Sequence, residues 1–180
     1  MVRYLIGTEE YELRLNGKQA NGLVLSEYSD ADWGGDSLDR KSTSGFLFQI
    51  GQAVVSWASR KQTCVATSTM EAEYVALSEA ATEAVWLRRL LGEFDEIQRE
   101  ATVIHEDNRS CMDFVSLERQ NKRSKHIHTK MHHAKDLCAK GVIQLRYCPT
   151  DSMIADILTK PLGPTKINQF ATSLGFVRKE

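Results

Sequence analysis

Four acidic residues stand inside mostly apolar stretches of this 180-residue chain: Asp30, Glu73, Asp107 and Asp156. A carboxylate on a buried face is costly unless a positive group compensates it. A shared cluster of divalent cations is the simplest arrangement that satisfies all four. If the four converge, the sequence predicts a metal-dependent site for phosphoryl transfer or hydrolysis. If they scatter, they are ordinary surface acids.

The longest predicted helix, residues 69–91, separates two of its own acids. Glu71 and Glu73 are two positions apart and therefore point to opposite sides of a helix. The positions at helical spacing from Glu71 form a largely polar face, so Glu71 is interpreted as a helix-start acid. Glu73 is interpreted as an acid on the core side, although its position alone favours a boundary residue over a ligand. The positions that follow Glu73 at helical spacing form an apolar stripe: Ala76, Leu77, Ala80, Ala81, Ala84 and Leu87.

The remaining acids fall at the ends of predicted strands or in a short helix. Asp30 ends a strand and Asp32 lies two residues later on the same face, so either could be a ligand. Asp107 closes an apolar strand, at a position where open sheets place functional groups, and Glu106 is expected to face the other way. Asp156 falls early in an amphipathic helix, where a simple helix-N-terminal charge is the alternative. Each acid taken singly favours the structural interpretation, and only their joint placement favours a shared site.

Apolar periodicity and chain breakers predict the elements that must position these acids. The helix 69–91 is expected to be capped by Ser68 or Thr69 and stopped by Gly92. Strands at 45–50 and 53–59 form a hairpin. A hairpin start followed by β–α–β alternation predicts an α/β fold, with a mixed sheet flanked by helices. The other predicted elements are strands at 11–15, 23–30, 102–106 and 142–148, and helices at 108–117, 126–140 (ended by Gly141), 152–159 and 165–174.

Composition indicates a globular protein of one domain, or of one domain and a tail. Hydrophobic residues make up 42% and charged residues 26% of the chain, which is not the composition of a disordered protein. The 23 Lys and Arg residues nearly balance the 24 Asp and Glu residues, so no global field favours a nucleic-acid partner. The four cysteines form no CxxC pair and are expected to be free thiols in a reducing compartment. Since no run of about eighteen apolar residues occurs, no membrane span is predicted.

Residues 119–140 form a window rich in basic residues and histidine. The window holds seven Lys and Arg residues and four of the five histidines, against one acid. His128 and His132 are spaced as an i, i+4 zinc pair, but no cysteine or carboxylate lies at matching spacing, and a solvated helix face is the commoner explanation. Contact with a nucleic-acid backbone is the favoured function of this window, on a weaker signal than the carboxylates.

Seven segments in order carry a recognisable pattern. They are YSDADWGG (28–35), DRKSTSG (39–45), EAEYVAL (71–77), WLRRLL (86–91), EDN (106–108), KHI (125–127) and ADILTKPL (155–162). Together they closely resemble the ribonuclease H domain of Ty1/copia-type LTR-retrotransposon Pol polyproteins. The resemblance runs from about Arg3 to the C-terminus, and it implies a ribonuclease H-like fold with a mixed five-stranded sheet flanked by helices.

By this resemblance the acidic tetrad is Asp30, Glu73, Asp107 and Asp156, which selects Asp30 over Asp32. The family mechanism implies two Mg²⁺ ions, with Mn²⁺ as a substitute, and Asp30 bridging both. Asp156 would hold the ion that activates water, and Glu73 with Asp107 the ion that stabilises the leaving 3′ oxygen. The implied reaction is hydrolysis of the RNA strand of an RNA–DNA hybrid, which is recognised by shape and 2′-hydroxyls. The alternative is a non-catalytic retroelement remnant that binds nucleic acid or acts as a structural connector.

The segment 125–133 departs from the family pattern. It reads KHIHTKMHH, where relatives commonly have KHIDIRYHF, and Met70 stands where Thr or Ala is usual. These changes affect packing and substrate handling and leave the tetrad intact. His132 matches the family position. The residues predicted to contact nucleic acid are Asn108, Arg123, Lys125 and His132.

The resemblance also divides the chain and predicts its partners. Residues 1–22 resemble the connection between reverse transcriptase and ribonuclease H, residues 23–160 form the ribonuclease H-like domain, and residues 161–180 form a C-terminal helical tail. Because the chain begins at Met1 without reverse transcriptase, integrase or protease, a polyprotein fragment, a remnant and a freestanding derivative are all expected origins. The predicted partners are an RNA–DNA hybrid and the reverse transcriptase and integrase regions of a parent polyprotein, without a membrane. An intracellular location is expected, either cytoplasmic in a virus-like particle or nuclear.

Overall fold

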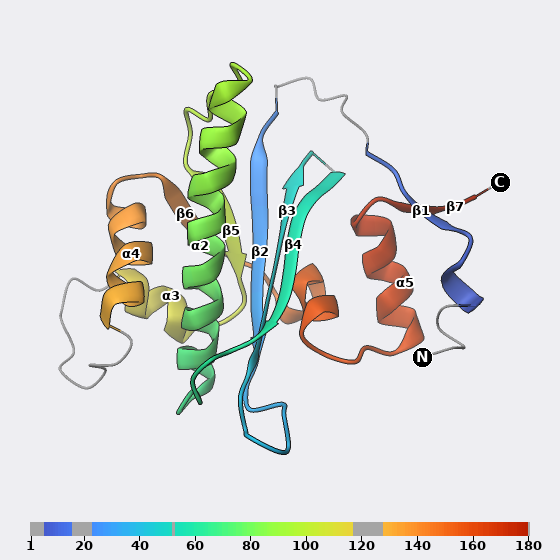
Figure 1. Cartoon of the computed structure of the whole chain (residues 1–180), viewed down its shortest axis with the longest axis horizontal. Helices are drawn as coiled ribbons and strands as arrows, with labels where there is room; N and C mark the ends of the chain where they lie inside the picture. The colour runs from blue at the N-terminus through green and yellow to red at the C-terminus, as the bar shows by residue number, and fades with distance from the viewer. Residues whose placement is uncertain (1–5, 16–22, 52, 117–127, 180) are drawn as a thin grey trace.

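A five-stranded mixed sheet forms the centre of the molecule (Figure 1). The computed structural model of the chain describes residues 6–15, 23–51, 53–116 and 128–179, with the backbone alone for 128–132. Strand order is β4-β3-β2-β5-β6; β2, β3 and β4 are antiparallel neighbours, and β5 and β6 continue the sheet parallel to β2. This is the mixed sheet that the sequence predicted. The strands are β2 (Leu25–Asp32), β3 (Thr43–Ile50), β4 (Ala53–Lys61), β5 (Thr102–Glu106) and β6 (Ile143–Tyr147).

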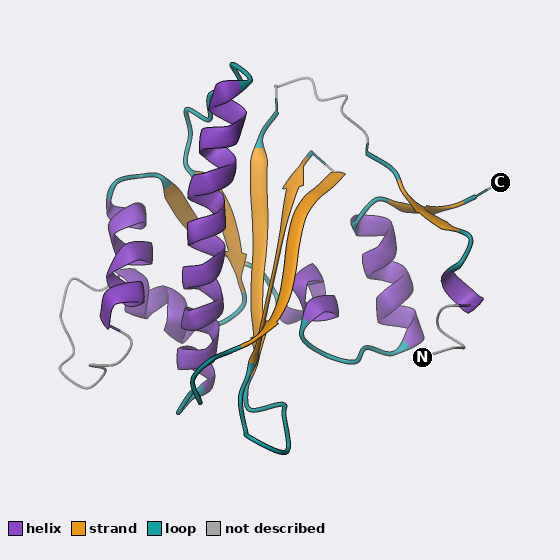
Figure 2. Ribbon diagram, in the orientation of Figure 1, coloured by secondary structure: helices purple, strands orange, loops and turns teal. Residues whose placement is uncertain are grey.

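Helices cover both faces of the sheet (Figure 2). On one face α2 (Thr69–Glu93) crosses β2 and β3, with α3 (Arg109–Ser116) and α4 (His128–Ala139) beside it. On the other face lie the 3₁₀ turn η2 (Ile154–Leu158) and α5 (Pro164–Ser173), preceded by the short turn η1 (Thr150–Ser152). A separate antiparallel pair joins β1 (Tyr11–Leu13) to β7 (Phe176–Arg178), so the predicted lead-in contacts the predicted tail.

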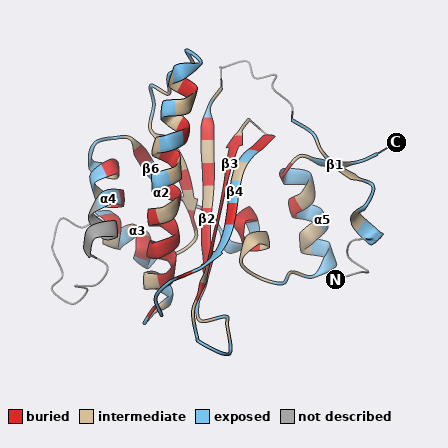
Figure 3. Cartoon of the chain, viewed as in Figure 1, coloured by how far each residue is buried: buried red, intermediate tan, exposed pale blue. Residues whose placement is uncertain are grey.

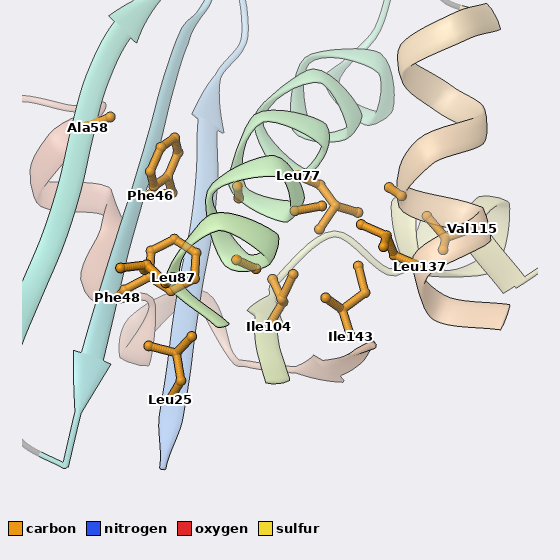
Figure 4. Close-up of a cluster of buried hydrophobic side chains, with 14 of the residues drawn as sticks. Leu25, Phe46, Phe48, Ala58, Leu77, Leu87, Ile104, Val115, Leu137 and Ile143 are labelled. Atoms are coloured by element: carbon orange, nitrogen blue, oxygen red, sulfur yellow. The ribbon is translucent and has the colours of Figure 1, made fainter. Parts of the chain in front are cut away.

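Strand β3 shows why two layers of helices are needed. Its side chains alternate between the faces: Phe46 and Phe48 pack with α2, whereas Leu47 packs with Ile154 of η2 and Phe170 of α5. Six consecutive residues of β3 are therefore buried, as Figure 3 shows for the centre of the sheet. The larger cluster, between the sheet and α2, α3 and α4, appears in Figure 4.

The long helix follows its predicted start and overruns its predicted end. The Oγ of Ser68 accepts the backbone N–H of Glu71 at 3.2 Å, which confirms the cap. The helix continues through Gly92 to Glu93 and is capped by Phe94, because Asp95 rather than Gly92 adopts the left-handed conformation, with φ at 63°. Gly141, with φ at 66°, follows the end of α4 as predicted.

The face of α2 that carries Glu71 is less polar than predicted. Tyr74, Val75 and Ser78 are buried, because α3 and α4 cover that side of the helix. The ring of Tyr74 meets Phe114 of α3 edge to face, with 5.3 Å between centroids. In the described part of the chain, no helix is long and apolar enough to cross a membrane. The domain limits at residues 22 and 160 stay a prediction.

Candidate metal centre

Asp30, Glu73 and Asp107 converge at one point. One carboxylate oxygen from each residue lies within 4.8 Å of those from the other two. Asp30 comes from β2, Glu73 from the second turn of α2, and Asp107 from the residue after β5. Asp30 and Glu73 are buried and Asp107 is half-buried. Three of the four predicted acids are thus brought together by three separate elements.

Burial leaves this group of three acids short of positive charge. Burial raises the pKa of Glu73 well above its ordinary range, and the nearby carboxylates of Glu106, Asp30 and Asp107 raise it further. The buried Oε2 of Glu73 has no hydrogen-bond partner among the described residues. An acceptor oxygen buried in this way is costly. Because a divalent cation would compensate it, the three residues fit an oxygen-ligated metal ion.

Glu106 is a further buried acid that interacts electrostatically with the three. It is completely buried, and its Oε1 accepts the backbone N–H of Asn108 at 3.0 Å. Burial raises the pKa of Glu106 to about 8. The Oδ1 of Asn108 accepts the N–H of Cys111 at 3.0 Å, so Asn108 caps α3. Its predicted contact with nucleic acid stays a prediction.

Asp156 lies outside the group of three and has a different environment. It is buried in η2, a 3₁₀ turn where the sequence predicted an amphipathic helix. Its Oδ1 lies 2.8 Å from Nζ of Lys160, and its Oδ2 lies 2.7 Å from Nζ of Lys166. Lys160 also reaches Oδ1 of Asp30, at 3.1 Å. The fourth acid is therefore joined to the other three through an ammonium group.

Gly45 determines how closely η2 approaches the sheet. It pairs with Asp30 across β2 and β3. A Cβ at Gly45 would lie only 2.6 Å from Cγ2 of Thr159 and 2.9 Å from Cβ of Leu158. The missing side chain lets Thr159 reach the site, where its hydroxyl donates to Oδ2 of Asp30.

Asp32 has a structural environment. Its Oδ1 accepts the backbone N–H of Thr43, and a Cβ on Gly35 would overlap its carboxylate. The side chain of Asp32 therefore shapes the loop between β2 and β3. Of the two aspartates that the strand pattern left open, Asp30 is the one in the cluster.

The predicted nucleic-acid residues of the basic window are only partly within the structure. Arg123 and Lys125 lie outside the described residues. His132 belongs to α4, but its side chain and that of His128 are also outside the described part, so the zinc pair is untested.

Several residues around the acids were not predicted to belong to the site. Lys160 stands four positions after Asp156 in the segment ADILTKPL, and this spacing is a signal for an ion pair on one side of a turn. Lys166 carried no comparable signal, since it reaches Asp156 from α5. Thr150, which donates to Oδ2 of Asp107 at 2.7 Å, is 43 residues distant in sequence.

Comparison with known proteins finds relatives that match nearly the whole chain. It is 35% identical over 178 residues, 99% of its length, to the retrovirus-related Pol polyprotein from transposon RE1 of Arabidopsis thaliana. It is 36% identical over 166 residues to the corresponding polyprotein from transposon TNT 1-94 of Nicotiana tabacum. The chain is a homologue of Ty1/copia-type Pol polyproteins. It spans about 12% of the length of these relatives, and no family model matches it.

Solved structures show the same fold. The N-terminal RNase H domain of a Mycobacterium tuberculosis protein, solved as a fusion with maltose-binding protein, superposes with a TM-score of 0.55. That match covers 84% of this Pol homologue and 99% of the other chain, at 14% identity. LC11-RNase H1 in complex with an RNA/DNA hybrid gives a TM-score of 0.52 at 16% identity, over 75% of this chain and 93% of the other. The fold is ribonuclease H-like.

Proposed function

We propose that this chain is a ribonuclease H that hydrolyses the RNA strand of RNA–DNA hybrids with two divalent metal ions, Mg²⁺ or Mn²⁺. The observation that carries the proposal is the convergence of Asp30, Glu73 and Asp107, in which a buried oxygen of Glu73 has no hydrogen-bond partner in the described part of the chain and needs a cation. The ribonuclease H fold, and a neighbour solved with an RNA/DNA hybrid, support the substrate class.

The position of each acid determines which metal ion it would hold. Asp30, Glu73 and Asp107 would hold one ion, and Asp30 with Asp156 a second. When bound, two such ions lower the pKa of an attacking water and stabilise the charge on the phosphate and the leaving oxygen. Thr159 and Thr150 fix the orientation of Asp30 and Asp107 through their hydroxyls.

The hybrid is expected to be bound by its helical shape and its 2′-hydroxyls rather than by sequence. Arg123, Lys125, His132 and Asn108 remain the proposed contacts to its backbone. The reverse transcriptase and integrase regions of a parent polyprotein are proposed partners, because the relatives that match this chain are Pol polyproteins.

A hybrid-cleavage assay tests the proposal. The protein, with Mg²⁺ or Mn²⁺, is expected to cut the RNA of a labelled hybrid, and excess EDTA to stop it. Asp107→Asn should reduce the rate by about 10³-fold, because it removes charge where the ions must be held. Asp113→Asn is the matched control, since Asp113 is an exposed acid on α3, and it should leave the rate within about twofold.

Two outcomes oppose the proposal. Well-folded protein that cuts no hybrid at any concentration of either ion would overturn it. Salt-sensitive hybrid binding that needs Arg123 and Lys125 but ignores Asp107→Asn would instead support the non-catalytic remnant.

A further inference from the structure

Lys160 places its ammonium between two of the four acids. Its Nζ lies 3.1 Å from Oδ1 of Asp30 and 2.8 Å from Oδ1 of Asp156. Asp30 also belongs to the group of three, so the ammonium lies directly beside the candidate metal centre. One positive group thus bridges two buried carboxylates, as an ion shared by them would.

The charge of Lys160 is needed in this position. Asp30 and Asp156 are almost completely buried, and two buried anions at one site repel each other and lack solvation. Burial raises the pKa of Asp30, and the Lys160 ammonium opposes that rise. Burial also disfavours the charge on Lys160, but Asp30 and Asp156 outweigh it and raise the pKa of Lys160. The side chain therefore stays an ammonium and compensates both acids.

The ammonium can leave without moving the backbone. Lys160 follows η2, and its side chain is 35% exposed. A lysine carries its charge on a flexible stem and is strongly hydrated. A small rotation of that stem would move Nζ from the two carboxylates into solvent. Lys166, by contrast, contacts Asp156 on the opposite oxygen and also lies 3.4 Å from the backbone oxygen of Thr150.

We propose that the Lys160 ammonium and a divalent cation alternately occupy the position between the carboxylates of Asp30 and Asp156. The ammonium holds the two carboxylates in place until the ion displaces it, so the second metal position is filled by the protein itself when metal is scarce. This inference rests on the metal pair of the proposed function. It follows that the first ion binds at Asp30, Glu73 and Asp107, and that the second binds more weakly because it must compete with the ammonium.

A Mn²⁺ titration without nucleic acid tests this order. Calorimetry on the full chain should show a stronger and a weaker binding event. Lys160→Met should tighten the weaker event at least about tenfold and leave the stronger one within about threefold. Lys166→Met removes the same charge from the same carboxylate without vacating the bridging position, and should change either event by less than about threefold.

Thermal melting separates displacement from a permanent ion pair. Without metal, Lys160→Met should melt below the wild type, because Asp30 loses its compensating cation. Saturating Mn²⁺ should bring the two melting temperatures together, since the ion then compensates Asp30 in both proteins. Lys160→Gln, which keeps a hydrogen-bond donor, is measured in parallel in case the methionine variant fails to fold.

Three results would overturn the inference: an unchanged weaker event in both Lys160 variants, an equal change in Lys166→Met, or a melting difference that persists at saturating Mn²⁺. The absence of a weaker event in every protein would do the same. Because metal binding is measured without substrate, failure of hybrid cleavage leaves this experiment intact. The two proposals therefore fail separately.

Discussion

The two sides of the candidate metal centre treat buried acids in opposite ways. On one side Glu73 is buried, with an oxygen that is unpaired among the described residues and a pKa raised well above its ordinary range. On the other side each oxygen of Asp156 meets a lysine ammonium within 2.8 Å. Asp30 lies at the boundary, with Lys160 on one oxygen and Thr159 on the other. The first side needs a cation from solution, whereas the second carries its own.

Buried charge alone therefore does not identify a metal ligand. A buried ion pair is a poor source of stability, but it keeps carboxylates charged and oriented without metal. An uncompensated group of acids lowers stability and persists where function demands it. The side with the unpaired Glu73 oxygen is thus the stronger indicator of a metal site. The side with the lysine-bound Asp156 indicates how the carboxylates are held in place without metal.

Gly45 offers the largest test of the contact between the two sides. Gly45→Ala should place its methyl against Thr159 and Leu158, at distances that no Cβ tolerates. The turn η2 would then shift, and Asp156 with Lys160 would move away from Asp30. We expect about a 10²-fold loss of hybrid cleavage, the effect of a misplacement of about 1 Å, with the stronger Mn²⁺ binding retained.

Gly163→Ala is the control for this change. A Cβ at Gly163 meets nothing within 4 Å, and its φ of −70° suits any residue. Cleavage should stay within about twofold. Equal activity of Gly45→Ala and wild type would show that the approach of η2 to β3 does not position the site.

A pair of threonines gives a smaller test. Thr159 donates to the buried Asp30, and Thr150 donates to the half-buried Asp107 at 2.7 Å. Thr159→Val should lower Mn²⁺ affinity about tenfold, the lower end of the range for a group that orients a metal ligand. Thr150→Val should lower it less, because water can replace a hydroxyl at an exposed position. A larger loss of Mn²⁺ affinity in Thr150→Val than in Thr159→Val would contradict this ranking of the two hydroxyls.

Local pattern was enough to predict the sheet and the side of α2 that carries Glu73. The apolar stripe beside Glu73 is fully buried, and periodicity needs no knowledge of the partner elements. The same reasoning failed on the other side of the helix, where Tyr74 is buried because α3 and α4, which follow much later in the sequence, pack against α2. Lys166 and Gly45 were missed for the same reason, since their contacts join residues far apart in sequence. The two 3₁₀ turns replaced a predicted helix because Met153, between them, is extended.

Glu27 supplies the smallest test, since it is a buried acid that does not belong to the group of three. It is fully buried on β2, and neither carboxylate oxygen has a hydrogen-bond partner among the described residues. Burial raises its pKa well above the ordinary value, and the charges of Glu83 and Glu106 add to this. Folded protein therefore keeps the proton on Glu27 at a pH where the unfolded chain has lost it.

The proton on Glu27 makes the stability of the protein depend on pH. Above the ordinary glutamate pKa of about 4.3 the unfolded chain binds fewer protons than the folded one, so the free energy of unfolding falls as pH rises toward the folded pKa. Glu27→Gln cannot ionise and removes this slope. In urea unfolding with EDTA present, the variant should match wild type near pH 4 and exceed it at pH 8 by on the order of 1 kcal/mol. Glu93→Gln, at an exposed position on α2, should show no such divergence.

Hybrid cleavage by Glu27→Gln should stay within about threefold, because a buried acid without a place in the cluster affects stability and not metal binding. A difference that is equal at both pH values would mean that burial does not hold the proton on Glu27, and the same physical cause would then be in doubt for Glu73.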